Sequence, residues 1–485
     1  MNRRIIGKLV GFLLLLECVF LFPSVIVSWI YNEPHALRAV FLTMLIAAVL
    51  GGGLWLLCRK AQRRFYAREG MLVTALGWIV LSAVGALPFV ISGEIPSYID
   101  ALFEVVSGFT TTGASILTAV ESMSKGLLFW RSFTHWLGGM GILVFLLAIV
   151  PMGKKSGGYS VHLLRAESPG PSVGKLVPKM RQTAAILYGI YFALTVLDVI
   201  FLLAGGMSLF ESLCTAFGTA GTGGFGVKND SMASYSPYIQ TVCTVFMALF
   251  GVNFSVYFLL LMRKFKQILH NEELWLYVGI MVSAIALITW NVVPLFPSVG
   301  QALRHAAFAV SSVMTTTGFA TEDFNVWPEL SRTILVVLMI CGASAGSTGG
   351  GIKCARVVLL AKSLRAKVRQ LLHPRSVNLV RVDGHTIDEE TLQGINTYMS
   401  AYCAIAIVSV LLLSLDGLSL ETNLTGMLAC LNNIGPGLGL VGPAGNYACF
   451  TPLSKVVLMV DMLMGRLEIF PILIMLSPRT WRKAG

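Results

Sequence analysis

Thr110-Thr111-Thr112-Gly113-Ala114 is the first of four short motifs that decide how this chain folds. Each motif follows one apolar stretch and precedes another, and aligning the motifs places their glycines at Gly113, Gly223, Gly318 and Gly435. The spacings of 110, 95 and 117 residues indicate that the chain repeats one unit four times. The other motifs are Gly221-Thr222-Gly223-Gly224-Phe225, Thr315-Thr316-Thr317-Gly318-Phe319 and Asn432-Asn433-Ile434-Gly435-Pro436.

The composition of the 485-residue chain is that of a membrane protein. Apolar residues make up 55% of it and charged residues 12%, and the mean hydropathy is +0.76. Uncharged runs such as Ala39–Cys58 and Met71–Ser92 reach the length of about 20 residues that a spanning helix needs. Residues 1–31 contain Glu17 and no obvious cleavage motif, so they predict a retained helix rather than a cleaved signal peptide. We expect an all-α polytopic membrane protein.

The net charge of +12 is concentrated in a few segments, which argues against a nucleic-acid partner. Most of the 36 basic residues lie in windows 3–8, 59–68, 154–181, 263–266, 353–381 and 479–483. Placing all these windows, and both termini, on the cytoplasmic side satisfies the positive-inside rule. The nine cysteines form no CxxC pair and no Cys/His cluster, so we interpret them as apolar packing residues.

The chain divides into a leading pair of helices and four pore units. Each unit is an apolar helix, a shorter segment that ends in a glycine motif, and a returning apolar helix. The short segments are expected to re-enter the membrane, which is tolerated only where backbone is buried or lines water. This gives ten spanning helices around one central pore. The divisions are 1–60 (two helices), 69–153, 179–263, 272–371 and 390–478 (units one to four), with cytoplasmic linkers 154–178 and 372–389.

The four motifs predict a cation selectivity filter. A cation that leaves water needs oxygen ligands to replace its hydration shell, and inward-turned backbone carbonyls supply them. Glycine permits the necessary backbone angles and leaves the bore open, and four helix C-termini add negative potential. The expected filter residues are Thr110, Thr111, Thr112, Gly113, Gly221, Thr222, Gly223, Thr315, Thr316, Thr317, Gly318, Asn432, Asn433, Ile434 and Gly435. A set of unrelated Gly-Thr helix caps is the alternative.

A gate is predicted within the last helix of unit three. The run from Gly342 to Gly351 is rich in glycine, and each glycine costs about 1 kcal/mol in a helix relative to alanine. The helix should therefore unwind below the filter, although close packing by small residues is an alternative. Arg466 lies in the last apolar helix, where a charge indicates function, and we expect it to face the pore. The gate residues are Gly346, Ser347, Thr348, Gly349, Gly350, Gly351 and Arg466.

Other polar residues in apolar segments receive weaker predictions. Glu104 and Glu211 lie in the short segments of units one and two, where they are expected to anchor the filter. Asn253 lies midway along its span and is a candidate to bond a filter backbone, whereas Arg131 and His135 are expected to make interhelical bonds.

With these residues in view, the chain resembles the TrkH/TrkG group of bacterial potassium-uptake proteins, within the Trk/Ktr/HKT superfamily. The resemblance implies a K⁺ filter at Gly113, Gly223, Gly318 and Gly435, a broken helix at Gly346–Gly351 and a pore arginine at Arg466. It also implies a homodimer and a cytoplasmic ring of nucleotide-binding regulatory subunits. The matching stretches are Ser107–Ala114, Gly223-Gly224-Phe225, Thr316–Phe319, Ala345–Lys353, Leu431–Gly439 and Gly465–Glu468.

The expected function is K⁺ uptake across the bacterial inner membrane, with no bound cofactor and no enzymatic activity. Two alternatives remain at this point. One is an ion-coupled secondary K⁺ transporter, because broken helices are typical of such proteins. The other is an intramembrane enzyme that uses Ser344, since Gly342-Ala343-Ser344-Ala345-Gly346 matches G-x-S-x-G, although no strand–turn–helix context or partner His and acid is visible.

Overall fold

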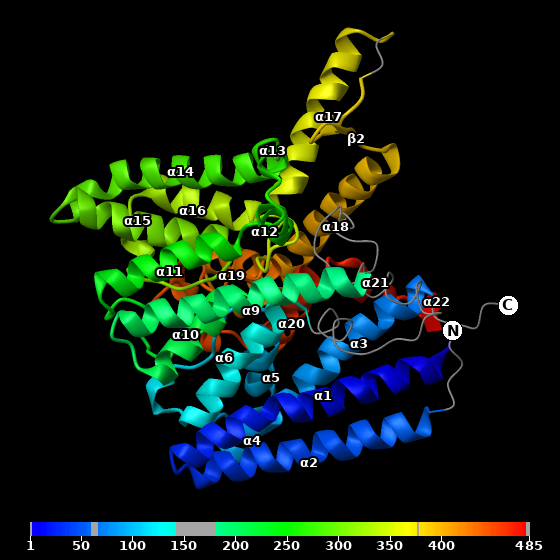
Figure 1. Ribbon diagram of the computed structural model, residues 1–485, viewed down its shortest axis with the longest axis vertical. Helices are drawn as coiled ribbons and strands as arrows, with labels where there is room; N and C mark the ends of the chain where they lie inside the picture. The colour runs from blue at the N-terminus through cyan, green and yellow to red at the C-terminus, as the bar shows by residue number, and fades with distance from the viewer. Residues whose placement is uncertain (1, 60–65, 142–179, 376–377, 482–485) are drawn as a thin grey trace.

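The computed structural model describes residues 2–59, 66–141, 180–375 and 378–481, which are mostly helical (Figure 1). Long helices form one body, from which α17 (Cys354–Leu372) projects at the top of the view. Arg3 donates a hydrogen bond to the carbonyl of Trp481 at 3.2 Å, so the two ends of the described chain lie together. The only strands in the described residues, β1 (Arg381–Val382) and β2 (His385–Thr386), form a short antiparallel hairpin after α17.

Two leading helices pack closely because of a pair of facing glycines. α1 (Arg3–Ile30) and α2 (Pro34–Leu57) are joined by a tight turn in which Asn32 has a φ of 55°. A Cβ added to Gly11 would lie 2.8 Å from the carbonyl oxygen of Gly51, and a Cβ on Gly51 would lie 2.8 Å from that of Gly11. Small residues at such contacts let helices approach in a membrane, where packing replaces the hydrophobic effect.

Four units follow, each with a short helix in its middle. Unit one contains α3 (Ala67–Gly85), α4 (Leu87–Ser92), α5 (Tyr98–Phe109) and α6 (Lys125–Gly139). Unit two contains α9 (Met180–Ala204), α10 (Leu209–Gly221), α11 (Pro237–Phe250) and α12 (Phe254–Leu261), and unit three contains α14 (Glu272–Val292), α15 (Val299–Met314), α16 (Glu329–Cys341) and α17. Unit four contains α18 (Glu389–Leu413), α19 (Leu420–Leu431), α20 (Pro452–Arg466) and α21 (Phe470–Leu476). The remaining helices are α13 (Phe265–Leu269), α22 (Pro478–Trp481) and six 3₁₀ turns at Val120–Ser122, Val293–Leu295, Phe324–Val326, Ser414–Asp416, Gly439–Val441 and Tyr447–Cys449.

The short middle helices α5, α10, α15 and α19 all begin in the same way. A serine precedes each one, and its hydroxyl accepts a hydrogen bond from the backbone N–H three residues later. This is the preferred N-cap arrangement, and it typically contributes about 1 kcal/mol. The four caps, Ser97, Ser208, Ser298 and Ser419, start the helices at equivalent places in the repeat.

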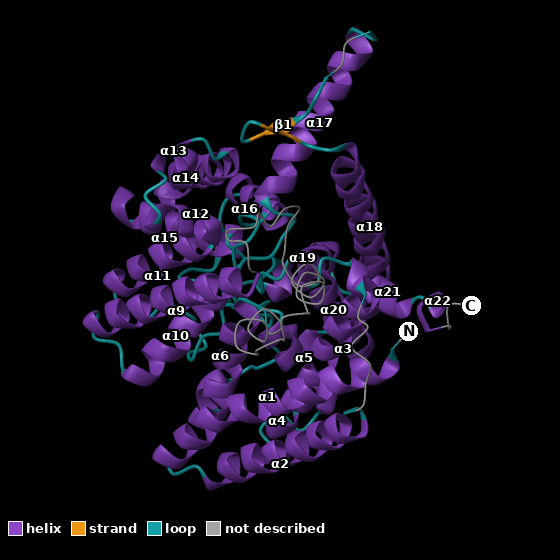
Figure 2. Ribbon diagram, turned by 45° about the vertical axis from the view of Figure 1, so that its right-hand side comes forward, coloured by secondary structure: helices purple, strands orange, loops and turns teal. Residues whose placement is uncertain are grey.

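The closing helices of the units are broken more often than expected. The sequence predicted one break, between α16 and α17, and the structure has it. α11 and α12 are also bent by 88° at Gly251–Asn253, and α20 ends before α21 at Leu467–Ile469. Glu468 and Ile469 have φ values of 60° and 66°, so the chain leaves helical geometry there without a glycine. Figure 2 shows the loops from these breaks gathered in the middle of the helical body.

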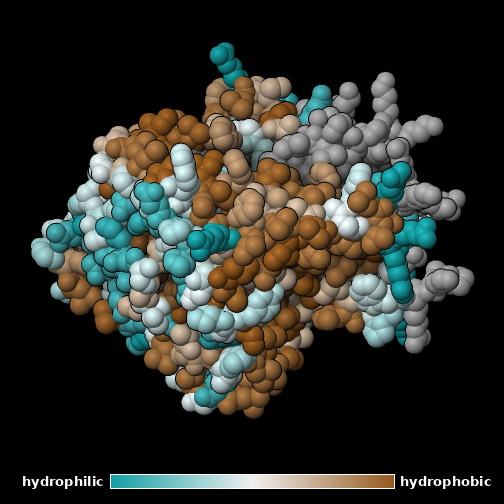
Figure 3. Space-filling view, turned by 90° about the horizontal axis from the view of Figure 1, so that it is seen from below, coloured by the Kyte–Doolittle hydropathy of each residue, from teal (hydrophilic) through white to brown (hydrophobic). Residues whose placement is uncertain are grey.

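The surface and the helix lengths are those of a multi-pass membrane protein. Six described segments are long and apolar enough to cross a membrane, and the bent pair α11–α12 is a seventh. The ten expected spans also include the broken pairs α16–α17 and α20–α21. The tenth is the expected span that α6 begins, and its residues 142–153 lie outside the described part of the chain. Hydrophobic residues cover much of the face in Figure 3, with hydrophilic ones gathered toward its left edge and in a smaller group at its right. The six segments are Arg3–Ile30, Pro34–Leu57, Ala67–Ser92, Gln182–Ala204, Glu272–Leu295 and Glu389–Asp416.

Candidate ion pathway

The four glycine motifs have one backbone conformation. At the end of each short helix, one residue takes the left-handed conformation: Thr111, Thr222, Thr316 and Asn433 have φ values of 56°, 52°, 61° and 56°. The N–H of the next residue then bonds the carbonyl five positions earlier, at 2.8–2.9 Å in every motif. A helix C-terminus closed in this way turns the following carbonyls away from the helix. The sequence prediction that the motifs end short helices is confirmed at these residues.

The register of the second motif differs from the one expected. Two residues after each left-handed residue stands a glycine with positive φ, and in unit two this is Gly224 rather than Gly223. Gly223 is therefore equivalent to Thr112, Thr317 and Ile434. Because Gly223 and Gly224 are adjacent, the sequence alone does not distinguish them, and the correction moves one filter glycine by one residue. The glycines in register are Gly113, Gly224, Gly318 and Gly435, with φ values of 78°, 76°, 85° and 97°.

These four glycines form a closed ring. A Cβ on Gly113 would lie closer than 3.0 Å to the carbonyl oxygen of Gly223, and the same relation holds from each motif to the next around the ring. No side chain is compatible with this spacing, because the obstacle is backbone rather than a movable side chain. The remaining pairs are Gly224 with the carbonyl of Thr317, Gly318 with that of Ile434, and Gly435 with that of Thr112.

A cavity of about 170 Å³ opens at this ring. All four glycines line it, together with residues of the loops that follow the motifs. Tyr447 from the loop of unit four donates a hydrogen bond to the carbonyl of Gly435 at 2.6 Å, which fixes the cavity wall to the ring. A ring of carbonyl-bearing loops beside a cavity is the arrangement in which a channel removes an ion's hydration shell.

A buried ion pair anchors the first motif. Glu104 on α5 and Arg131 on α6 are bonded at 2.6 Å, and both side chains are at most 3% exposed. The carboxylate also accepts hydrogen bonds from the hydroxyl of Ser115 at 2.8 Å and the N–H of Ile116 at 3.0 Å. The guanidinium lies 3.6 Å from the ring centre of Phe225, the last residue of the second motif. The pair therefore joins motifs one and two, and the expected anchoring role of Glu104 is consistent with its contacts.

His135 makes a second link between the same motifs. Its Nδ1 lies 2.8 Å from the carbonyl oxygen of Gly108, and its Nε2 accepts a hydrogen bond from the N–H of Phe225 at 3.3 Å. Since a carbonyl only accepts, this geometry assigns the imidazole proton to Nδ1. Glu211 and Asn253 make other contacts than those expected. Glu211 bonds the hydroxyl of Ser208 at the start of α10, at the opposite end of that helix from the motif. Asn253 caps α12, because its side chain accepts a hydrogen bond from the N–H of Ser255. Both therefore act on helix starts.

In the fourth motif, asparagines stand where the first and third motifs have threonines. Asn433 donates to the hydroxyl of Thr112 in the first motif and to the carbonyl of Met462 on α20, both at 2.9 Å. Asn432 bonds the hydroxyl of Tyr402 on α18 at 2.9 Å. These amides join the fourth motif to its neighbour and to the helices behind it.

The loop between α16 and α17 lies against the inner side of the ring. The N–H of Gly350 bonds the hydroxyl of Thr316 at 2.6 Å, and the N–H of Gly351 bonds the carbonyl of Asn432 at 3.0 Å. The close approach requires glycine, since a Cβ on Gly350 would overlap the carbonyl oxygen of Asn432. Two of the predicted gate residues, Gly350 and Gly351, are thus in direct contact with motifs three and four.

Arg466 is buried and holds this loop. Its guanidinium donates to the carbonyl of Thr348 at 2.8 Å and to the carbonyls of Gly138 and Gly139 at the end of α6. Glu468, two residues after Arg466, pairs with Arg356 on α17. Arg466, a unit-four cation, therefore bonds carbonyls of units one and three.

Sequence reasoning missed two charged residues at the same loop. Lys353, with a φ of 77°, donates its ammonium group to the carbonyl of Gly349. Glu273 on α14 accepts from the N–H groups of Ala345 at 2.5 Å and Ala355 at 3.1 Å, on the two sides of the loop. Charge within an apolar segment was the signal for Lys353; nothing in the sequence indicated Glu273, because its partners lie more than 70 residues away.

Comparison with known proteins places this geometry in a family. The model of the TrkH family, described as a cation transport protein, matches residues 36–295 and 278–483. The Trk system potassium uptake protein TrkH of Salmonella typhimurium is 36% identical over 493 residues and covers 100% of both chains. The Trk system potassium uptake protein TrkG of Escherichia coli K12 is 30% identical over 485 residues, 99% of each chain.

A solved structure agrees with the fold. The crystal structure of the potassium transporter TrkH from Vibrio parahaemolyticus matches with a TM-score of 0.89 and 31% identity, over 99% of this chain and 100% of the other. The expected helical membrane fold is therefore confirmed. The relatives carry names of transport proteins, which confirms the expectation of a transporter rather than an enzyme. By these matches over nearly its whole length, the chain belongs to the TrkH family of cation transport proteins.

Proposed function

We propose that this chain is the pore-forming subunit of a bacterial potassium-uptake system in the inner membrane. K⁺ loses its hydration shell at the carbonyls of the four motifs and passes the ring of Gly113, Gly224, Gly318 and Gly435. The 342–353 loop then closes or opens the path. A cytoplasmic nucleotide-binding regulatory subunit sets the position of the loop, both termini are cytoplasmic, and the chain works as a homodimer.

The closed ring of glycines supports this proposal most directly. Four motifs, 94 or more residues apart in sequence, present the same backbone angles and the same contact with the next carbonyl. Isolated helix caps would not share one contact in a cycle. The names of the relatives supply potassium as the ion.

The flux of ⁸⁶Rb⁺ into proteoliposomes that hold this chain alone tests the proposal. The vesicles are loaded with K⁺, so that the K⁺ concentration is higher inside than outside. No proton gradient and no Na⁺ gradient is imposed. The chain is assayed with the Arg466→Gln substitution, which frees the loop. We expect ⁸⁶Rb⁺ uptake that external K⁺ competes away and that the same concentration of Na⁺ leaves unchanged.

Three controls give the measurement its meaning. Empty liposomes set the leak, and a protonophore shows whether a hidden proton gradient drives uptake. Uptake that occurs only with an imposed proton or Na⁺ gradient would contradict a channel-like path and favour a coupled transporter. Uptake inhibited equally by Na⁺ and K⁺ would contradict potassium as the preferred ion.

A further inference from the structure

Two cavities meet on α17, away from the ion pathway. The first, of about 460 Å³, is lined by Lys362, Arg365 and Arg369 of α17 and by the segment that leads into β1. The second, of about 680 Å³, lies between α14 and α17 and is lined mainly by apolar side chains. Lys362 and Arg365 line both cavities, so a basic site and an apolar groove are continuous. The groove residues include Trp275, Leu276, Val357, Val358 and Ala361.

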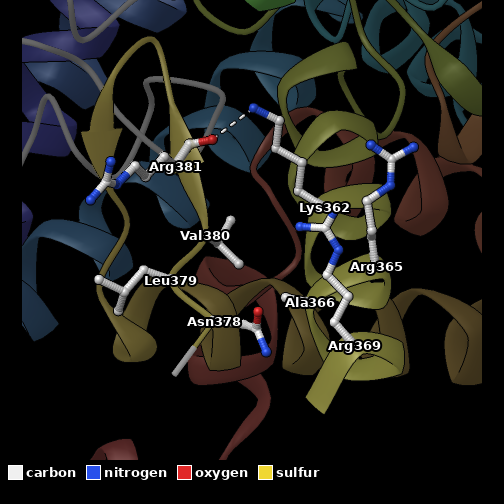
Figure 4. A pocket seen from close by; sticks show the side chains of 8 residues that line it. All are labelled: Lys362, Arg365, Ala366, Arg369, Asn378, Leu379, Val380 and Arg381. Atoms are coloured by element: carbon white, nitrogen blue, oxygen red, sulfur yellow. Dashed lines mark hydrogen bonds between the residues drawn. The ribbon is translucent and has the colours of Figure 1, made fainter. Parts of the chain in front are cut away.

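The basic cavity has more positive charge than the chain neutralises. Figure 4 shows Lys362, Arg365 and Arg369 leaving one helix, with Val380 opposite. Lys362 is paired with Glu272 and also bonds the carbonyl of Arg381. Arg365 and Arg369 are exposed and form no ion pair among the described residues, and no acidic residue lines this cavity.

The spacing of these cations is unfavourable without an anion. Residues 362, 365 and 369 stand at positions i, i+3 and i+7, so they share one face of α17. Like charges four residues apart destabilise a helix by a few tenths of a kcal/mol. A phosphate between the arginines would convert the repulsion into charge-assisted hydrogen bonds, because guanidinium forks match phosphate oxygens.

The position of the site is that of the lipid headgroup region. Glu272, the partner of Lys362, is the first residue of α14 and of a membrane-crossing segment that ends at Leu295. Trp275 lies one turn further in, and its ring is more than half exposed, as is common for tryptophan at a membrane interface. α17 projects beyond this level (Figure 1), so its basic face begins where the apolar surface ends.

From this juxtaposition we propose that the α14–α17 face binds an anionic phospholipid of the cytoplasmic leaflet. The headgroup phosphate lies against Arg365 and Arg369, and an acyl chain lies in the groove beside Trp275 and Ala361. A free phosphate would use the basic cavity alone, and an acidic protein segment would leave the apolar groove empty. Only a lipid uses both cavities.

Native mass spectrometry of the detergent-solubilised full chain tests this proposal. Phosphatidylglycerol is titrated against phosphatidylcholine with the same acyl chains, and the bound fraction gives the affinity. We expect tighter binding of phosphatidylglycerol. The double variant R365Q/R369Q should weaken that binding by about tenfold or more, since each basic residue at the surface adds to the affinity for anionic lipid. Ala361→Trp, which fills the groove and keeps the charge, should weaken both lipids.

K264Q/K266Q is the matched control, because it removes two exposed cations at the start of α13 that line neither cavity. It should leave phosphatidylglycerol binding unchanged. Equal binding of the two lipids would overturn the proposal, as would an unchanged affinity in R365Q/R369Q. Soluble glycerol 3-phosphate that competes at the same concentration as the lipid would show a phosphate site instead. The assay measures no flux, so its result is independent of the proposed function.

Discussion

At the scale of single residues, glycine is required where backbone meets backbone. Gly113 and Gly93 have φ values of 78° and 80°, so both occupy a conformation that side chains disfavour. They differ in their surroundings: a Cβ on Gly113 would overlap the carbonyl oxygen of Gly223, whereas a Cβ on Gly93 would meet nothing within 4 Å. The pair separates the effect of the ring from the effect of backbone strain.

Gly113→Ser is expected to lower ⁸⁶Rb⁺ flux by about tenfold or more, or to let Na⁺ compete with K⁺. The reason is that the carbonyl of Gly223 must move away from its place in the ring. Gly93→Ser carries a similar strain of roughly 1 kcal/mol and should keep the flux and the K⁺ preference of the parent chain. Equal effects of the two substitutions would refute the ring as the selective element.

The Glu104–Arg131 pair gives a prediction about stability. Glu104→Gln removes one partner of a buried ion pair and leaves the guanidinium without its counter-charge, which typically costs about 3–5 kcal/mol. We expect a clear fall in the thermal unfolding midpoint of the purified protein, followed by intrinsic fluorescence.

The matched control is Glu121→Gln. Glu121 is exposed and accepts one hydrogen bond, from the N–H of Asn229 at 3.2 Å. Its loss should change the midpoint little, because exposed polar contacts contribute little to stability. If Glu104→Gln were as stable as the control, the pair would not anchor the first motif.

At the scale of elements, the four motifs and the α16–α17 loop are held by breaks in the helices behind them. The α16–α17 loop touches two motifs, and Arg466 at the end of α20 bonds that loop and the end of α6. The cation thus joins three closing segments at one point. Removing the guanidinium of Arg466 should therefore change the position of the α16–α17 loop more than that of the four motifs.

Arg466→Gln is therefore predicted to raise flux through the chain alone. Each hydrogen bond to a charged group contributes about 1.5–3 kcal/mol, and a bias of 1.4 kcal/mol is a factor of ten, so about a tenfold increase is expected. Arg466→Lys keeps the charge but loses the forked donors, and it should give an intermediate flux. A flux in Arg466→Gln at or below that of the parent chain would contradict a closing role.

The sequence predicted the elements whose residues carry a local signal. Four glycine motifs and one glycine-rich run marked the short helices and the unit-three break, because glycine in an apolar segment is costly unless the backbone needs it. The break at Leu467–Ile469 was missed, although Gly465 and Pro471 flank it, because the residues that take positive φ there are Glu468 and Ile469 rather than glycines. The sequence could not decide between Gly223 and Gly224, because only the contact around the ring distinguishes them. It could not indicate a role for Glu273, because the partners of Glu273 are distant in sequence.

At the scale of the whole molecule, the repeat requires all four motif loops on one side of the membrane. Cys449 lies in the loop between α19 and α20 of unit four, is exposed, and stands two residues from Tyr447, which bonds the ring. Lys266 lies in the loop between units two and three, where the positive-inside rule places the cytoplasm. These two positions report opposite sides.

A membrane-impermeant maleimide should label Cys449 in intact cells, and Cys449→Ser should abolish that labelling. The other described cysteines compete little, because apart from Cys403 they are buried or partly buried, and Cys403 lies midway along the apolar helix α18, which faces lipid. In the Cys449→Ser background, Lys266→Cys should be labelled only after the membrane is permeabilised. Labelling of Lys266→Cys in intact cells would reverse the orientation of every unit, since the repeat ties the four motif loops to one side of the same ring.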